Sequence, residues 1–197
     1  MKLLQTHWVA VLSAGLFGLL LSPPIRDVFL TRMSLHMNLQ LPLFVLCGMG
    51  FIAPWRVFLT QLFAPVNQFG LTGLLSAMGL FSIWMVPRAL DAAVIYSSID
   101  FLKVASLLLT GIFLAISWRP AGAVLQAFFV GNMMWMSITV GILVAYSPSR
   151  LCNAYLIEDQ RVAGYGLVAF SICAGLLWLL NLRYANISLG KRSNISS

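Results

Sequence analysis

Charged side chains are scarce in this chain. Its 197 residues include 12 Lys or Arg and five Asp or Glu, so 9% of the residues are charged, against about 25% in typical soluble proteins. Hydrophobic residues make up 60% of the chain. A soluble domain of this size has too little interior to bury so much apolar surface, whereas a lipid bilayer accepts it. The composition therefore excludes an ordinary soluble protein and predicts a membrane protein.

Residues that commonly carry chemistry are also rare. The chain has two histidines, His7 and His36, and three cysteines without a CxxC pair, so it lacks the usual signals of a dithiol redox centre or a zinc site. The histidines are expected near opposite membrane faces, which argues against a bis-histidine haem site. No predicted span carries two carboxylates, and the chain has neither a Gly-rich phosphate loop nor a Ser/His/Asp set. We therefore predict that the protein is not an enzyme.

The net charge of +7 does not indicate a nucleic-acid partner. The largest basic cluster, Arg183, Lys191 and Arg192, has no interleaved aromatic residues and belongs to no recognisable groove-reading helix. Basic residues that follow a last transmembrane helix are typical of a topology signal with weak attraction to anionic lipid. We expect the bilayer, and no nucleic acid, as the partner of this charge.

Long uncharged runs dominate what is present. Most of the six runs reach or exceed the roughly 20 residues with which a helix crosses about 30 Å of hydrocarbon. The fourth is short, and it becomes a full span if Lys103 extends from the helix end to the lipid headgroups. The runs are Leu3–Ile25, Met33–Trp55, Val57–Pro87, Val104–Trp118, Pro120–Ser149 and Val162–Leu182.

These runs predict an all-α fold, a polytopic bundle of about six transmembrane helices. Residues 1–183 form this membrane domain, and residues 184–197 form a short basic tail that is too brief to fold alone. The first helix has no small-x-small cleavage site and is expected to remain, ending at Pro23 and Pro24. The predicted spans are 4–21, 35–54, 68–86, 102–118, 122–146 and 162–182.

Six spans place both termini on one side of the membrane. Lys and Arg divide evenly, six on each side, so the positive-inside rule does not decide the orientation. All five acids fall on the side opposite the termini, and three basic residues follow the last span. These two features favour cytoplasmic termini.

One helix face has the composition of a soft metal site. Met33, His36 and Met37 recur at i, i+3 and i+4, and Gln40 continues the same face. Two thioethers and an imidazole are a ligand set for Cu(I). Equally, methionine fills gaps between helices and histidine forms hydrogen bonds across them. A second methionine group, Asn132 to Met136, has the same two interpretations.

Polar residues mark two of the expected loops. Asp91 follows Pro87 and Arg88 after the third span, and Glu158 to Arg161 precede the sixth span. We expect Asp159 to cap the sixth helix, where a carboxylate meets free backbone N–H groups. Gly164 allows a neighbouring helix to approach closely.

Four segments resemble the CtaG-type cytochrome c oxidase assembly factors, multi-pass membrane proteins linked to copper insertion into haem–copper oxidases. The match to an Asp-Gln-x-x-Ala-Gly signature, carried by Asp159, Gln160 and Gly164, is the most specific. The segments occur in the family's order across residues 34–170. They are Ser34–Gln40, Pro87–Ala93, Leu107–Leu114 and Glu158–Gly164.

The chain also departs from that family. Gln40 stands where the resemblance implies a second histidine, and further expected histidines are replaced by residues around Asp100 to Ser106. The resemblance therefore implies a non-enzymatic partner of a bacterial respiratory oxidase, which either handles Cu(I) at Met33, His36 and Met37 or keeps only a docking role. A transporter or channel is the competing class, although the expected lack of buried carboxylates counts against it. A haem- or quinone-associated subunit is a third.

Overall fold

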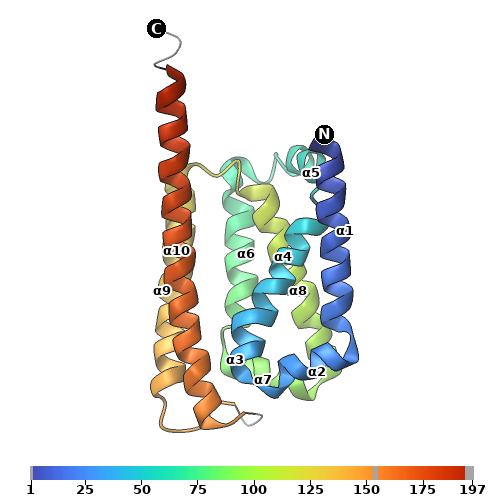
Figure 1. The fold of residues 1–197 in the computed structure, drawn as a ribbon, viewed down its shortest axis with the longest axis vertical. Coiled ribbons are helices and arrows are strands. Elements are labelled where there is room, and N and C mark those ends of the chain that lie inside the picture. Colours follow the sequence, from blue (N-terminus) through green and yellow to red (C-terminus); the bar gives the residue numbers. More distant parts are fainter. Residues whose placement is uncertain (1, 153–154, 194–197) are drawn as a thin grey trace.

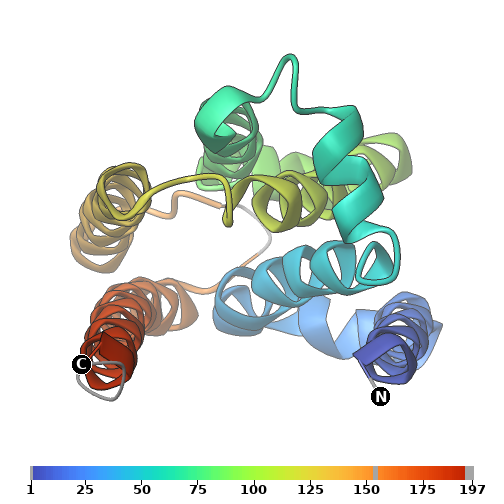
Figure 2. The same cartoon turned by 90° about the horizontal axis from the view of Figure 1, so that it is seen from above.

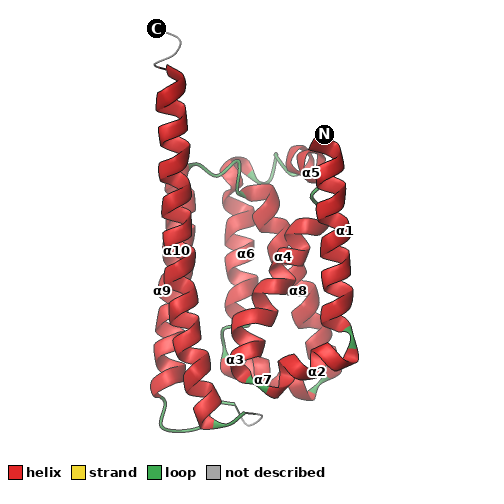
Figure 3. Ribbon diagram, in the orientation of Figure 1, coloured by secondary structure: helices red, strands yellow, loops and turns green. Residues whose placement is uncertain are grey.

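The computed structural model describes residues 2–152 and 155–193, and every regular element in these ranges is a helix (Figures 1 and 3). Four of the described helices are long and apolar enough to cross a membrane, and two bent helix pairs raise this to as many as six. The prediction of an all-α helical membrane bundle is confirmed.

Four straight spans form most of the bundle. The first is continuous from Met33 to Phe51 and comprises α3 (Met33–Leu35), the π-helical turn η1 (His36–Gln40) and α4 (Leu41–Phe51). The others are α8 (Ser97–Ser117), α9 (Ala123–Tyr146) and the first part of α10 (Ile157–Ser193), which reaches Leu182 as an apolar span.

The two bent pairs differ from the sequence prediction, which treated their second halves as loops. α1 (Lys2–Leu21) turns by 69° into α2 (Pro23–Thr31), and the helix of η2 (Gln68–Gly70) and α6 (Leu71–Ile83) turns by 69° into α7 (Pro87–Ile95). Proline begins α2 and α7 because the first helical turn needs no N–H from it. Both short helices lie across the end of the bundle opposite the start of α1 (Figure 1).

α4 and α8 occupy the centre of the larger part of the bundle. α4 packs along α8 and α1, α8 also packs along α6, and α9 packs along α10. The α9–α10 hairpin stands to one side, joined to the rest through contacts of α10 with α3 and η1 and of α9 with α6 (Figures 1 and 2). The hairpin is thus attached mainly at the end that carries α2 and α7.

Two glycines bring α4 and α8 into backbone contact. A Cβ atom at Gly48 would lie 2.2 Å from the Leu108 carbonyl oxygen, and one at Gly111 would lie 2.0 Å from the Val45 carbonyl oxygen. Any larger side chain would force the helices apart. Close helix approach of this kind replaces the hydrophobic drive that lipid cannot supply.

The other end of the bundle is closed by α5 (Arg56–Leu62) and the turn that leads into α6. The Asn67 side chain accepts a hydrogen bond from the Gly73 N–H at 2.9 Å and donates to Ser117 Oγ at 2.9 Å. Gly70 takes φ +74°, a conformation that favours glycine. The start of α1 and the far end of α10 both lie toward this end (Figure 1).

Candidate functional site

A buried polar cluster lies where α2, η1, α8 and the segment before α10 meet. It consists of Arg26, Asp100, Lys103, His36 and Tyr155. Its centre is Lys103, whose side chain is 1% exposed. The ammonium contacts Asp100 Oδ1 at 2.7 Å, one turn earlier on α8, and His36 Nε2 at 2.9 Å. The sequence prediction that Lys103 extends toward lipid headgroups is wrong. The lysine points inward because a carboxylate and an imidazole meet it there, and a charge is tolerated inside a bilayer protein when it is paired.

Asp100 joins two cations. While Oδ1 accepts from Lys103, Oδ2 accepts from the Arg26 guanidinium, at 2.9 Å from one terminal nitrogen and 3.2 Å from Nε. Arg26 belongs to α2, so this ion pair ties the bent helix to α8. The Asp100 side chain is 15% exposed and that of Arg26 is 35% exposed. The row of charges thus runs from the bundle interior to its end face.

His36 is held at both ring nitrogens. An ammonium group can only donate, so Nε2 accepts from Lys103 and Nδ1 carries the proton. Nδ1–H then donates to the Tyr155 hydroxyl at 2.9 Å. His36 is fully buried, and Tyr155 is 5% exposed. The imidazole therefore links the charged row on α8 to the chain that precedes α10.

The helix that carries His36 widens at this point. Residues His36 to Gln40 form a π-helical turn, in which the Leu41 N–H donates to the His36 carbonyl. Pro42 has no N–H, so the α-helical bond from residue 42 to the Asn38 carbonyl does not exist. Such turns often occur at functional sites. The predicted shared face is confirmed, because Met33, His36, Met37 and Gln40 are all buried.

The loop before α10 covers the cluster. Cys152 is buried and its thiol donates to the Pro87 carbonyl at 3.2 Å, at the start of α7. Burial and the nearby Asp91 raise the pKa of Cys152 to about 11. Burial, followed by the charges of Cys152, Asp159 and Asp91, also raises the pKa of Tyr155. Both groups stay protonated at neutral pH, and Tyr155 keeps its hydroxyl proton.

Asp159 and Gln160 fasten distant segments together. Asp159 accepts from the Met33 N–H and from Ser34 Oγ at 2.7 Å, so it caps α3 as well as standing in the first turn of α10. The hydrogen bonds that Asp159 accepts thus come from α3, whereas the sequence predicted a cap on its own helix. Gln160 accepts from the Leu151 N–H at 2.9 Å and donates to the Val144 carbonyl at 3.1 Å. The Asp-Gln pair therefore holds the loop, α9 and α3 against α10.

Gly164 serves packing inside the chain. A Cβ atom there would lie 2.4 Å from the Gly141 carbonyl oxygen and 2.6 Å from the Ala145 nitrogen, both on α9. The glycine is thus placed against the chain's own hairpin, and its surface is unavailable to another subunit. Asp91, the other predicted motif residue, lies on α7 and is also buried, with 8% of its surface exposed.

The Cu(I) hypothesis meets a specific obstacle in this arrangement. The structure brings Met33, His36 and Met37 to one buried face, but Lys103 and Tyr155 occupy the two nitrogens of the imidazole. A copper ion would have to displace one of them. Within residues 2–152 and 155–193, no three His, Cys, Asp or Glu side chains gather where they could hold a metal.

Sequence reasoning missed most of this cluster. Asp100 and Lys103 stand three residues apart at the start of an apolar helix, and this spacing is the one signal in the sequence of an internal ion pair. Nothing in the sequence places Arg26 or Tyr155 beside them. The second methionine group does not join the site: Asn132 donates to the Phe128 carbonyl on its own helix, and Met136 accepts from Ser82.

Comparison with known proteins adds no relative. The chain matches no protein-family model, no curated protein and no solved structure. The resemblance to the CtaG-type factors therefore rests on the four segments quoted above. What the structure adds is the position of those segments relative to one another.

Proposed function

We propose that this integral membrane protein is a non-enzymatic partner of a haem–copper terminal oxidase, acting in its assembly or as an accessory subunit. Its site of action is the bacterial cytoplasmic membrane, with both termini in the cytoplasm. The oxidase comes from the sequence resemblance. The structure contributes an observation that supports it.

That observation is the convergence of three of the four resembling segments. Ser34 of the first meets Asp159 of the fourth, and Pro87 of the second meets Cys152 just before the fourth. The third segment, Leu107–Leu114, continues along α8 away from this end, and its Gly111 packs against α4. Three of the segments, up to 125 positions apart, thus contribute to one hydrogen-bonded end of the bundle.

A docking role agrees better with this end than copper transfer does. His36 is engaged on both sides, whereas large apolar side chains stand exposed around the cluster. Phe101 lies between Asp100 and Lys103 on α8 and is 76% exposed, and Tyr96 just before α8 is 58% exposed. Aromatic residues at a membrane end suit both the bilayer interface and a subunit contact.

Native purification tests the proposal. Purification in mild detergent should recover oxidase subunits with the protein, and deletion of its gene should lower oxidase activity. Phe101→Ala should weaken the co-purification, because it removes an exposed anchor without touching the buried cluster. Phe128→Ala is the matched control, since Phe128 is 59% exposed on α9, away from this end. Normal oxidase activity in the deletion strain, with no subunit recovered, contradicts the proposal.

The orientation has its own test. A cysteine at Ser98, which is exposed near the start of α8, should react with an impermeant thiol reagent in intact cells. A cysteine at Ser196 should react only after the membrane is opened. The reverse pattern would place the polar cluster on the cytoplasmic side.

A proton or ion transporter is the second candidate, and a specific observation favours it. The expectation that no carboxylate is buried is wrong, because Asp91 is 8% exposed and the Asp100 side chain 15% exposed. Asp100, Lys103, His36 and Tyr155 form an unbroken row of titratable groups, and such rows carry protons in pumps. Proton flux in proteoliposomes that disappears in Lys103→Met would favour this function over docking.

A further inference from the structure

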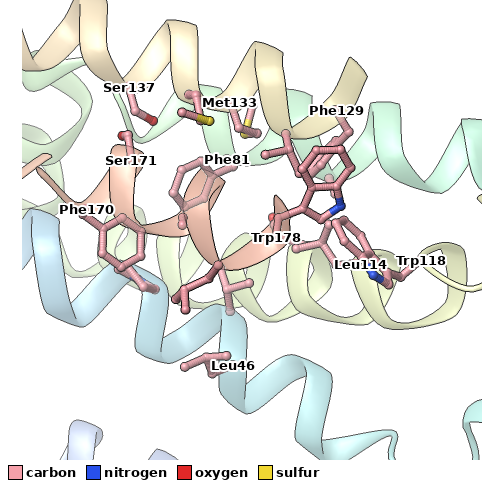
Figure 4. Close-up of a pocket in the computed structure, with 18 of the residues that line it drawn as sticks. Leu46, Phe81, Leu114, Trp118, Phe129, Met133, Ser137, Phe170, Ser171 and Trp178 are labelled. Atoms are coloured by element: carbon pink, nitrogen blue, oxygen red, sulfur yellow. The ribbon is translucent and has the colours of Figure 1, made fainter. Parts of the chain in front are cut away.

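A large apolar cavity separates the α9–α10 hairpin from the rest of the bundle. Its volume is about 500 Å³, and its walls come from α4, α6, α8, α9 and α10. Figure 4 shows Met133 and Phe129 of α9 facing Leu46 of α4 and Leu114 of α8 across it, with Phe170 and Trp178 of α10 alongside. The cavity exists because the hairpin is fastened mainly at the far end, through α3 and η1.

The cavity walls are mostly apolar, and two of their three hydroxyl groups are hydrogen-bonded within their own helices. Thr110 donates to the Ser106 carbonyl at 2.9 Å, and Ser171 donates to the Leu167 carbonyl at 2.7 Å. Both hydroxyls are therefore used within their own helices. Water would find few partners here, whereas a hydrocarbon chain would lose nothing on entry.

The depth of the cavity matches one leaflet of a bilayer. On α10 its lining runs from Phe170, near the middle of the Ile157–Leu182 span, to Asn181 at the end of that span. Eleven helical steps cover roughly 16 Å, which is close to half of the 30 Å hydrocarbon core. Within the Met33–Phe51 span the lining residues, Pro42 to Met49, likewise lie in the half nearer the start of α1, and those of α9 run from Phe129 to Ser137, just past its middle. The cavity thus has the length of a single acyl chain.

The outer end of the cavity suits a lipid headgroup. Trp118 and Trp178 line this end, where indoles are favoured at the membrane interface. Trp178 Nε1 donates to Gln126 Oε1 at 3.4 Å, which adds a polar rim. Arg119 is exposed and adjoins Trp118 in the chain. All five acids of the chain lie toward the opposite end, so this rim attracts an anionic phosphate.

The apolar lining and the length of roughly 16 Å suit a single hydrocarbon chain. We propose that the cavity binds one acyl chain of an anionic phospholipid from the leaflet on the side of the termini, with the headgroup at Trp118, Trp178 and Arg119. This site is separate from the polar cluster and does not depend on the proposed oxidase partner.

Native mass spectrometry of the full chain tests this inference. The protein is purified in mild detergent and offered dioleoyl phosphatidylglycerol, dioleoyl phosphatidylcholine or an isoprenoid quinone. We expect one retained phosphatidylglycerol. Ala174→Phe should reduce its retention by roughly tenfold, because the ring fills the volume of several methylene groups. Ala169→Phe is the matched control, on an exposed position of α10 outside the cavity lining, and should retain the lipid.

The outcomes separate the alternatives. Arg119→Gln should remove the preference for phosphatidylglycerol over phosphatidylcholine while leaving chain binding intact. If Ala174→Phe does not accumulate, the wild-type protein provides a second test. A phosphatidylglycerol with a photoreactive tail should crosslink to the cavity lining of α9 and α10. Three results would overturn the proposal. The protein could retain the quinone in place of phospholipid, or Ala174→Phe and Ala169→Phe could retain phosphatidylglycerol equally. The third such result is crosslinking confined to the outer faces of the bundle.

Discussion

Asp100→Asn probes the energetics of the polar cluster most directly. The carboxylate contacts Lys103 at 2.7 Å and Arg26 at 2.9 Å. The amide keeps the size of the side chain but carries no charge, and its NH₂ group faces the donors of a cation. Lys103 is fully buried and keeps only the neutral His36 as a close partner. The variant therefore leaves an ammonium group in the bundle without a counter-charge.

The expected cost follows from this burial. Breaking a buried ion pair by removing one partner costs about 3–5 kcal/mol, because the remaining charge stays desolvated. Lys103→Met alone should cost less, about 1–3 kcal/mol, since Asp100 still accepts from Arg26. The double variant Asp100→Asn/Lys103→Met removes both buried charges, and methionine adapts to the vacated space. It should recover about 2–3 kcal/mol relative to the sum of the single variants.

Unfolding of the purified protein in a fixed detergent measures these differences. A cost of about 4 kcal/mol corresponds to a fall in Tm on the order of 10 °C for a chain of this size. Arg26→Gln is the control, because its side chain is a third exposed and an exposed pair contributes about 1 kcal/mol or less. A loss below about 1 kcal/mol in Asp100→Asn, or strict additivity in the double variant, would refute the argument.

Three further predictions concern single sites. If Cu(I) displaces Lys103 from His36, anaerobic loading should give copper in the wild type and none in His36→Ala; equal stoichiometry would remove this site from consideration. Gly164→Leu should abolish accumulation of the protein, because the new side chain meets the backbone of α9. Gly79→Leu should be tolerated, because nothing lies within 4 Å of its Cβ position. Blotting of membranes compares the amounts of the two variants. The pKa of Cys152 is raised from 9.0 to about 11, so the unfolded chain loses this thiol proton first, and stability should fall as pH rises from 9.0 to about 11. Cys152→Ala should flatten that part of the pH profile.

The helices were predictable because a bilayer constrains them strongly. Every backbone polar group must be satisfied within a span, so an uncharged run of sufficient length can only be a helix. The six predicted spans each correspond to a helix, and the buried face of Met33, His36 and Met37 followed from spacing alone. The bends were not predictable. Proline indicates where a helix begins or ends, but the 69° turns into α2 and α7 depend on what those helices pack against.

For the candidate site, too, some features follow from the sequence and others only from the packing of the helices. The sequence alone determined the class of protein, its helical spans, and the presence of Asp159, Gln160 and His36 in segments that resemble one family. Only the tertiary structure decided that Lys103 points inward. A lysine near a helix end is long enough to extend either outward to lipid headgroups or inward to a buried carboxylate, so its identity alone does not set its direction. The choice depended on His36, which lies 67 positions before Lys103 and accepts a hydrogen bond from it. It depended also on Asp100, whose carboxylate is held by Arg26 from another helix. Local periodicity carries no information about such partners, because they become neighbours only when the helices pack.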